Sequence, residues 1–544
     1  MGADFCVVKK VCLGSLALLT IVSEAVAVES RLTKPEVQQI INQGSTYASK
    51  VNPKAVIAVV DREGFVLGVW DVAGGATVLS GSLIAGAVSR AGTAAALSSN
   101  QNAFTSRTAG YIIQQHFPPT VRNTSPGPLV GVGFSNLFYS DTNHVKKIPD
   151  PFIGSTRVEI LFPAEPFRSP GDRTDGVPFA SLADSPGGVP LYKNGELVGG
   201  VGVTGDGSPS DLSPAAAIFA GQVQPNFTPG YKTGKDTDED IALAAQSGFR
   251  PASGILATKV LLNGIRIPYV FATSKFPEPG PGGPVGSAVP GYSLGESPEA
   301  YPYDQTALGG VQGEIRQKIR PDPLPGTIGG ENRLTAAEVT NILTLAAQRC
   351  NITRAGIRLP LGTRAKTFIS VVNNPNQDGV APAVLGVFRV GEATMFSWDV
   401  SVQKARTAVF FSNNQMAMSC RSVGFLAQKF FPPGLDGRPF GPLYGFQEAV
   451  SLKTAPGTPP GTFTFPGNPN LPNGMTIFPG GMPLYRNGQL IGAIGVSGDG
   501  VDQDDIITAS GCANFLPPKN IRADNFIYRG ARLPYAKFPR NPSE

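Results

Sequence analysis

The chain has 544 residues, of which 41% are hydrophobic and 16% charged, with a formal net charge of +5 at pH 7. A single core rarely grows beyond about 250 to 300 residues, so we expect two or three packed units. The apolar content argues against global disorder. The weak, evenly spread positive charge argues against nucleic acid as a partner.

The N-terminus has the three parts of a secretory signal peptide. A Lys-Lys pair at 9–10 precedes an apolar stretch at 11–22, and Ala-Val-Ala at 25–27 supplies small residues for cleavage. The apolar stretch is shorter than the roughly 20 residues that span a bilayer, which favours a cleaved signal over an uncleaved anchor. We therefore expect residues 1–27 to be removed. The mature chain is then periplasmic or secreted, without an integral membrane segment.

Three cysteines follow the predicted cleavage point, at Cys350, Cys420 and Cys512. An odd number without Cys-x-x-Cys spacing indicates neither a disulfide framework nor a zinc site. At most one bridge forms, and buried free thiols are an equal alternative.

An internal duplication organises the rest of the chain. Its first block is Leu-Thr-x-x-Glu-Val at 32–37 and again at 334–339. The Thr and Glu form a capping box, and the flanking Leu and Val form a hydrophobic staple. Each copy therefore predicts the start of a helix.

The next two blocks predict a hairpin and then two helices. β-rich runs at 55–60 and 65–72 match runs at 367–372 and 383–390. Both helical blocks stop at Phe-Pro-Pro, because proline lacks the amide donor and clashes with the preceding turn. The helical segments are 85–98 and 103–115 in the first copy, and 401–412 and 416–429 in the second.

The sharpest match lies between 187–199 and 480–492, where both copies contain Gly-Gly-x-Pro-Leu-Tyr-x-Asn-Gly. Asn-Gly between apolar runs is the strongest short-range hairpin signal. Glycine turns follow at 202–207 and 495–500. A last helix is predicted to begin at Asp240-Ile241 in the first copy and at the same dipeptide, Asp505-Ile506, in the second.

Each copy thus reads helix, hairpin, two helices, hairpin, helix, which predicts an α+β unit with an antiparallel sheet flanked by helices. We expect domain 1 at 31–276, a Pro/Gly-rich linker at 277–330 and domain 2 at 331–544. Two long loops, 120–178 and 208–239, are shorter or absent in the second copy. Such surface loops often carry specificity.

The duplicated motifs resemble the GlcG/HbpS-like haem-binding (haem-degrading) domain family. The resemblance rests on Gly-Gly-x-Pro-Leu-Tyr-x-Asn-Gly-x-x-x-Gly-x-x-Gly-Val-[Thr/Ser]-Gly at 187–205 and 480–498, on Lys-Ala-Arg-Thr-Ala at 404–408, and on the Asp-led helices. It implies two tandem profilin-like or PAS-like units. It also implies a haem or related tetrapyrrole as the cofactor, with haem carriage or redox sensing as the role.

His116 ends the third predicted helix beside Phe117, and its counterpart in the second copy is Phe430. As a functional residue, it would offer a neutral imidazole to haem iron. As a structural residue, it would be a cation favoured by the helix C-terminus. His144 lies in a polar loop and is expected to be solvated.

Two Lys/Arg and Thr pairs are candidate cofactor-binding residues, Arg90 with Thr93 and Lys404 with Thr407. Residues three apart share one helix face. The cation would pair with a ligand carboxylate and the hydroxyl would add a hydrogen bond, since the resemblance covers these positions. The alternative is a solvated helix face with a packing threonine.

No catalytic residue is predicted, because neither histidine lies in a hydrolase or zinc-protease motif. Together with the family resemblance, the sequence predicts an exported protein that binds haem or another small acidic ligand. One alternative is a haem-degrading enzyme. A third is a structural or protein-interaction module without ligand, and the chain has a homo-oligomer or a protein as a possible partner.

Overall fold

The fold is described from a computed structural model of the chain. The described residues are 30–75, 81–130, 182–206, 232, 234–299, 301–446, 453–454, 463–464, 468 and 470–537, apart from positions 115, 273, 302, 361 and 472. The predicted signal peptide, His144 and most of the two long loops lie outside these residues. We call 30–299 the first half and 303–537 the second half. No helix in the described part is long and apolar enough to cross a membrane.

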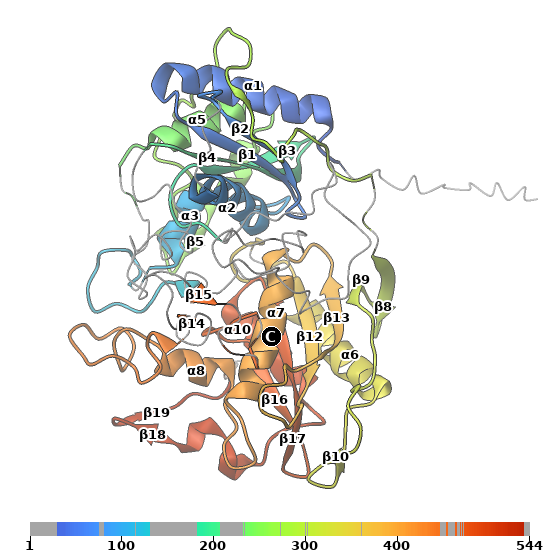
Figure 1. Ribbon diagram of the computed structural model, residues 1–544. Coiled ribbons are helices and arrows are strands. Elements are labelled where there is room, and N and C mark those ends of the chain that lie inside the picture. The colour runs from blue at the N-terminus through green and yellow to red at the C-terminus, as the bar shows by residue number, and fades with distance from the viewer. Residues whose placement is uncertain are drawn as a thin grey trace, which may run out of the picture.

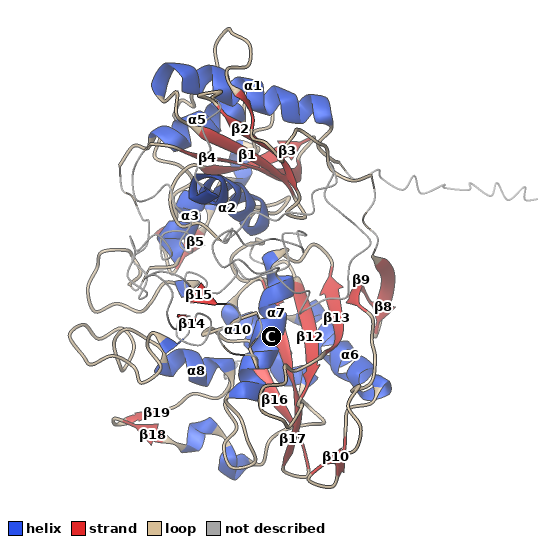
Figure 2. Cartoon of the chain, in the orientation of Figure 1, coloured by secondary structure: helices blue, strands red, loops and turns tan. Residues whose placement is uncertain are grey.

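The first half is built on an antiparallel sheet of order β3-β4-β1-β2-β7. Helix α2 packs on one face, while α1 and α5 cover the other (Figures 1 and 2). Its strands are β1 (Val56–Asp61), β2 (Val66–Asp71), β3 (Gly188–Lys193), β4 (Glu196–Thr204) and β7 (Ser287–Ala288). Its helices are α1 (Lys34–Val51), α2 (Gly81–Leu97), α3 (Ser106–Ile112) and α5 (Thr237–Ala245), and a small hairpin pairs β5 (Leu261–Leu262) with β6 (Ile265–Arg266).

Both faces of this sheet are buried, because alternate residues of β1 enter different clusters. Ile57 and Val59 pack in the cluster that contains α1, whereas Val56 and Ala58 pack against α2. A strand buried on both faces is a continuous apolar run, and all six residues of β1 are buried.

The second half repeats this arrangement, with strand order β16-β17-β12-β13-β9-β8. Helices α6 and α10 pack together, and α7 crosses β17 and β12. Its strands are β8 (Asp304–Leu308), β9 (Val311–Gln317), β12 (Thr367–Asn373), β13 (Val384–Val390), β16 (Gly481–Arg486) and β17 (Gln489–Gly498). Its helices are α6 (Ala336–Ile352), α7 (Phe396–Phe410), α8 (Cys420–Leu426) and α10 (Val501–Gly511). Short pairs are β10 (Thr327–Ile328) with β11 (Glu331–Asn332), β14 (Lys453–Thr454) with β15 (Phe463–Thr464), and β18 (Ile527–Tyr528) with β19 (Ala531–Arg532).

The local signals predicted from the sequence form as expected. Thr33 and Thr335 each donate a backbone N–H to the glutamate three residues on, at 2.8 and 2.9 Å. Asn194 and Asn487 adopt positive φ angles of 54° and 48° in their hairpin turns, as a primed turn requires. The mixed α+β class with antiparallel sheets is confirmed.

The pairing of the last helical block is corrected by one residue. Asp505 pairs with Arg421 as Glu239 pairs with Arg107, so Asp505 corresponds to Glu239 and not to Asp240. Both copies have consecutive acidic residues here, so the sequence allows more than one alignment of the two copies. The ion pairs show which residues correspond. The helices also begin earlier, at Thr237 and Val501.

The Pro/Gly-rich segment 277–330 connects the halves but is more than a linker. Strand β7 pairs with β2, and β9 pairs with β13, so the segment extends an edge of each sheet. Gly309 and Gly310, with φ angles of 56° and 83°, form the turn between β8 and β9. Some of the glycines that indicated a linker therefore form hairpin turns.

The two halves share one apolar cluster across their boundary. Val400 and Phe478 of the second half pack in the main cluster of the first half. Figure 1 shows α2 and α3 on the side of the first half that faces the second half. This boundary is where the cavities described below lie.

Candidate functional site

The two predicted cations are buried in matching ion pairs. Arg90 on α2 is 1% exposed, and its Nη1 lies 2.9 Å from an oxygen of Asp238 on α5. Lys404 on α7 is 0% exposed, with its Nζ 2.8 Å from Asp504 on α10. Each cation also donates to a carbonyl of the neighbouring strand, that of Val203 or Val496. These contacts join the helix on one side of each sheet to the helix on the other.

The two predicted threonines also have equivalent partners. Thr93 Oγ1 accepts the backbone N–H of Ala183 at 2.6 Å, and Thr407 Oγ1 accepts that of Thr476 at 3.0 Å. Both hydroxyls hold the segment that precedes the Asn-Gly hairpin. In this structure they bind the protein's own backbone.

His116 lies at the boundary between the halves and uses both ring nitrogens. Nδ1 is 2.9 Å from the carbonyl oxygen of Thr124, and Nε2 is 2.7 Å from Asp436 in the second half. Its ring stacks on Phe430, the matching residue of the second copy, with centroids 6.4 Å apart. An iron bond at either nitrogen requires one of these contacts to break. Among the described residues, His116 makes no contact with the other four predicted site residues.

The glycine turn after β17 shapes a loop that the sequence did not mark. Asp499 in this turn accepts from Arg358 Nε at 3.1 Å and from the N–H of Lys366 at 2.6 Å. Its carbonyl accepts the N–H of Ile357 at 2.9 Å. A Cβ on Gly356 would lie 2.1 Å from the Asp499 carbonyl oxygen, so only glycine fits there.

This loop, residues 354–360, also contacts the first half. Arg358 Nη1 donates to the Ser98 carbonyl at 3.0 Å, and Ser99 Oγ donates to the Arg358 carbonyl at 3.1 Å. Asn102 Nδ2 lies 3.4 Å from the Ile357 carbonyl. The loop is therefore held on one side by β17 and on the other by the end of α2.

A cavity of about 810 Å³ lies beside this loop, and we call it the groove. Its walls are the hairpin segment 259–263 of the first half, the 354–360 loop and the start of α10. Most of its side chains are apolar, and they include Val260, Leu261, Leu262, Ile357, Leu359 and Val501.

Two cations line the groove, Lys259 and Arg354, and both are exposed. Neither forms an ion pair with another described residue. Asp502, the acid of the groove, already pairs with Arg421 at 2.6 Å and Lys537 at 2.9 Å. The groove therefore combines apolar walls with available positive charge, as a site for an amphipathic anion requires.

A smaller apolar pocket adjoins the groove and shares Ile357, Gly500 and Val501 with it. Leu97, Phe104 and Ile112 come from the first half; Phe396 and Phe478 come from the second half. Asp504 also lines this pocket, and burial raises the pKa of its carboxyl to about 7 despite the Lys404 partner.

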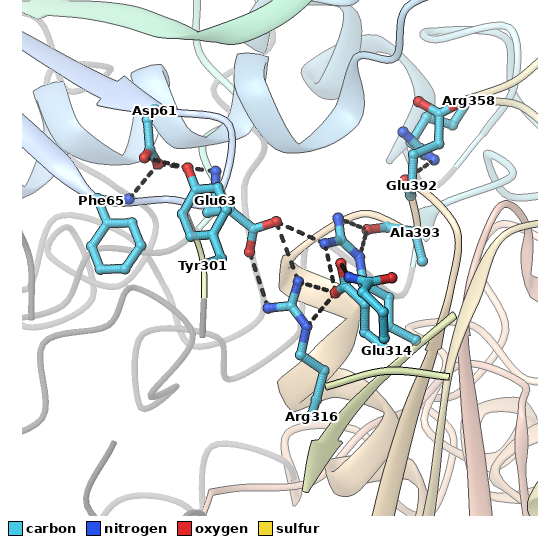
Figure 3. A network of polar contacts seen from close by, with 11 residues as sticks. Asp61, Glu63, Phe65, Tyr301, Glu314, Arg316, Arg358, Glu392 and Ala393 are labelled. Atoms are coloured by element: carbon cyan, nitrogen blue, oxygen red, sulfur yellow. Dashed lines mark hydrogen bonds and ion pairs between the residues drawn. The ribbon is translucent and has the colours of Figure 1, made fainter. Parts of the chain in front are cut away.

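A third cavity, of about 600 Å³, is more polar and is bordered by a buried cluster of charges. Glu63 of the first half accepts from Arg316 at 3.0 Å and from Arg389 at 2.7 Å; Glu314 lies 2.8 Å from Arg316 Nε (Figure 3). Arg316 also stacks over the Tyr303 ring at 3.6 Å. We call Glu63, Glu314, Arg316 and Arg389 the interface cluster, because it links the two halves.

The described residues offer no activated thiol. Cys350, Cys420 and Cys512 are free and buried, which agrees with the free-thiol alternative. Burial raises the pKa of Cys350 to about 12 and raises the pKa of the other two thiols as well. All three are therefore neutral thiols at pH 7, poor nucleophiles and poor metal ligands.

The comparison with protein-family models matches one segment of the chain. Residues 380–513 match the family model described as haem degrading protein HbpS-like. This segment contains Lys404 and Thr407, the interface cluster's Arg389, and the Gly500–Gln503 wall of the groove. No curated protein matches the chain.

Three solved structures are similar to parts of the chain. A PduOC–haem complex is 21% identical, covering 34% of this chain and 94% of that one, with a TM-score of 0.22. The ORFY protein of Klebsiella pneumoniae is 20% identical over 36% and 95%, with a TM-score of 0.23. A double mutant of HbpS from Streptomyces reticuli is 18% identical over 36% and 96%, with a TM-score of 0.21. The likeness of residues 380–513 to haem degrading protein HbpS-like rests on the family model alone.

Proposed function

We propose that this protein binds haem or a related tetrapyrrole in the groove between its halves. The observation that carries the proposal is that the HbpS-like segment supplies one wall of a large, apolar and positively charged groove. A volume of about 810 Å³ lies within the range of roughly 300 to 1,000 Å³ that is usual for ligand sites.

A porphyrin has two apolar faces and, at one edge, two carboxylates. Its faces would be removed from water by Ile357, Leu359 and Val501, which is the main favourable contribution for apolar surface. Its carboxylates would pair with Lys259 and Arg354, which have no competing ion pair among the described residues. Haem, when bound, would supply an iron centre and a strong visible chromophore.

The proposal also covers the domain organisation, the export and the biological role of the whole chain. We propose that it carries two tandem HbpS-like units and is exported with residues 1–27 as its signal peptide, for haem carriage or redox sensing. The matching registers support the tandem reading: Ile57 pairs with Val203 in the first sheet, and Ile369 pairs with Val496 in the second. A homo-oligomer or a protein partner stays a proposal.

The predicted residues Arg90, Thr93, His116, Lys404 and Thr407 define a competing site. Binding there would have to replace buried ion pairs or the two His116 hydrogen bonds. Breaking a buried pair by removing one partner costs about 3 to 5 kcal/mol. The groove requires no such exchange, so it is the site that we favour.

Titration of the mature chain with haemin tests the proposal. A Soret band should shift and saturate at one haemin per chain. A Lys259→Ala/Arg354→Ala double variant should bind roughly three- to tenfold more weakly, since two partly exposed ion pairs are lost. The matched control is Lys54→Ala/Lys275→Ala, which removes the same charge from exposed positions outside the groove. Equal weakening by both variants would place the site elsewhere, and no spectral change in the parent chain would contradict haem binding.

A further inference from the structure

The side chains around the groove supply charge and apolar surface but no usual ligand for haem iron. Proteins hold haem iron with His, Cys, Met or Tyr. None of these residue types is among the described residues that line the groove or its adjoining apolar pocket. The acid of the groove, Asp502, is held by Arg421 and Lys537.

His116, the three cysteines and Met395 are possible iron ligands elsewhere in the described chain, and each lies in other surroundings. His116 binds Thr124 and Asp436 through its two nitrogens. The cysteines are buried, neutral thiols. Met395 lines the polar cavity and not the groove. None of these groups is placed to bind a metal ion at the centre of a molecule in the groove.

We propose that the groove recognises tetrapyrroles by their carboxylates and flat apolar faces and does not require the central iron. This inference rests on the proposed function and specifies its ligand class, which is dicarboxylic porphyrins with or without a metal. Lys259 and Arg354 select for the two carboxylates, and the wall formed by Ile357, Leu359 and Val501 selects for a flat apolar body.

The proposal has a consequence for the relative affinities of haem and metal-free porphyrin. If iron contributes no bond to the protein, haem and its metal-free analogue present the same carboxylates and nearly the same apolar area. The favourable terms, area burial and ion pairing, are then equal for the two ligands. Salt should weaken both to the same extent, because it screens the exposed cations.

Parallel titrations of the full mature chain with haemin and with protoporphyrin IX test this inference. Haemin is followed by absorbance, and protoporphyrin IX by its fluorescence. We expect dissociation constants within about threefold of each other. The Lys259→Ala/Arg354→Ala variant should weaken both ligands by the same factor, roughly three- to tenfold. His116→Ala should change neither.

The outcomes separate this inference from the proposed function. Haemin binding with protoporphyrin IX at least a hundredfold weaker would show that iron is coordinated, which overturns the inference and leaves haem binding standing. Loss of haemin binding alone in His116→Ala would have the same meaning. Failure of both ligands to bind would overturn the proposed function itself.

Discussion

Asp61 and Glu63, two carboxyl groups in one turn, have pKa values that their surroundings shift in opposite directions. Asp61 is 0% exposed and accepts three hydrogen bonds, from the N–H groups of Glu63 and Phe65 and from the Tyr301 hydroxyl. No cation in the described part of the chain forms an ion pair with it. Burial raises its pKa to about 7. Burial also raises the pKa of Glu63, but Arg316 and Arg389 outweigh this effect and hold that pKa well below its usual range (Figure 3).

The raised pKa of Asp61 predicts a pH dependence of stability. The stabilisation is complete below the unfolded pKa of 3.8 and is lost as pH rises through about 7, because the folded state holds the proton more tightly. Asp61→Asn keeps a side-chain oxygen for the N–H groups of Glu63 and Phe65, while its amide NH2 would donate to the Tyr301 oxygen in place of the present Tyr301 donation. The variant should lose part of this decline and be more stable than the parent at pH 8, by on the order of 3 kcal/mol.

Urea unfolding at pH 5 and pH 8 measures this effect. Asp304→Asn, at an exposed position on β8, is the control and should follow the parent at both pH values. An Asp61→Asn chain that declines as steeply as the parent would show that Asp61 is ionised in the folded protein.

The interface cluster predicts a large effect of a small change at Glu63. Glu63→Gln leaves the buried guanidinium groups of Arg316 and Arg389 with one carboxylate, Glu314, between them. Removing one partner of a buried pair costs about 3 to 5 kcal/mol. Glu299→Gln, whose side chain is 88% exposed in an ion pair with Arg31, should change the free energy of unfolding by less than about 1 kcal/mol. A Glu63→Gln effect as small as the control would contradict this account of the cluster.

At the scale of elements, local signals were predictable and contacts between distant elements were not. The capping boxes and Asn-Gly turns depend on residues within four positions of each other, so the sequence indicates them directly. The roles of Arg90 and Lys404 depend on Asp238 and Asp504, which lie 148 and 100 positions away. The sequence therefore indicates a cation on a helix face but not the acidic partner that a helix across the sheet supplies.

The groove was missed for a similar reason. Its walls come from three segments, at 259–263, 354–360 and 500–503, and only the last follows a motif that the sequence singled out. The Gly-Asp-Gly turn at 498–500 is the sequence feature that marks one wall of the groove, since its Asp499 binds the 354–360 loop. The sequence contains no rule, however, that links this aspartate to Arg358.

The close contact of the 354–360 loop with Asp499 predicts that adding one methyl group at Gly356 displaces the loop and changes the shape of the groove. In Gly356→Ala, the new Cβ would meet the Asp499 carbonyl oxygen at 2.1 Å, so the loop must move away from β17. We expect a loss of about 1 to 3 kcal/mol in stability and a weakening of porphyrin binding of roughly tenfold. Gly254→Ala, where a Cβ meets nothing within 4 Å, is the control for thermal unfolding and titration. Unchanged binding in Gly356→Ala would show that the loop does not shape the site.

At the scale of the whole molecule, the duplication predicts two domains, and in the structure the two halves share apolar and charged contacts across their boundary. Val400 and Phe478 complete the apolar cluster of the first half, and Glu63 completes the interface cluster. Segment 277–330 adds strands to both sheets. The Pro and Gly content of segment 277–330 indicates its turns, but it does not indicate that the segment adds strands to the two sheets.

This packing predicts that the halves unfold together. Hydrogen exchange with mass spectrometry, followed over a range of urea concentrations, should give peptides from β1 and β12 the same unfolding midpoint, since each half stabilises the other. In Glu63→Gln the two midpoints should separate. Two distinct midpoints in the parent chain would mean that the halves are independent, as the sequence alone suggested.

The most direct test of the central claim uses two equivalent hairpin positions, Leu261 on β5 and Ile527 on β18. Their side chains are 54% and 71% exposed, but only Leu261 lines the groove. Leu261→Glu places a negative charge where the ligand carboxylates and apolar edge would lie, whereas Ile527→Glu adds the same charge outside. In a haemin titration, the account predicts that Leu261→Glu weakens binding at least tenfold and Ile527→Glu leaves it unchanged. Equal binding by the two variants would contradict a tetrapyrrole site in the groove.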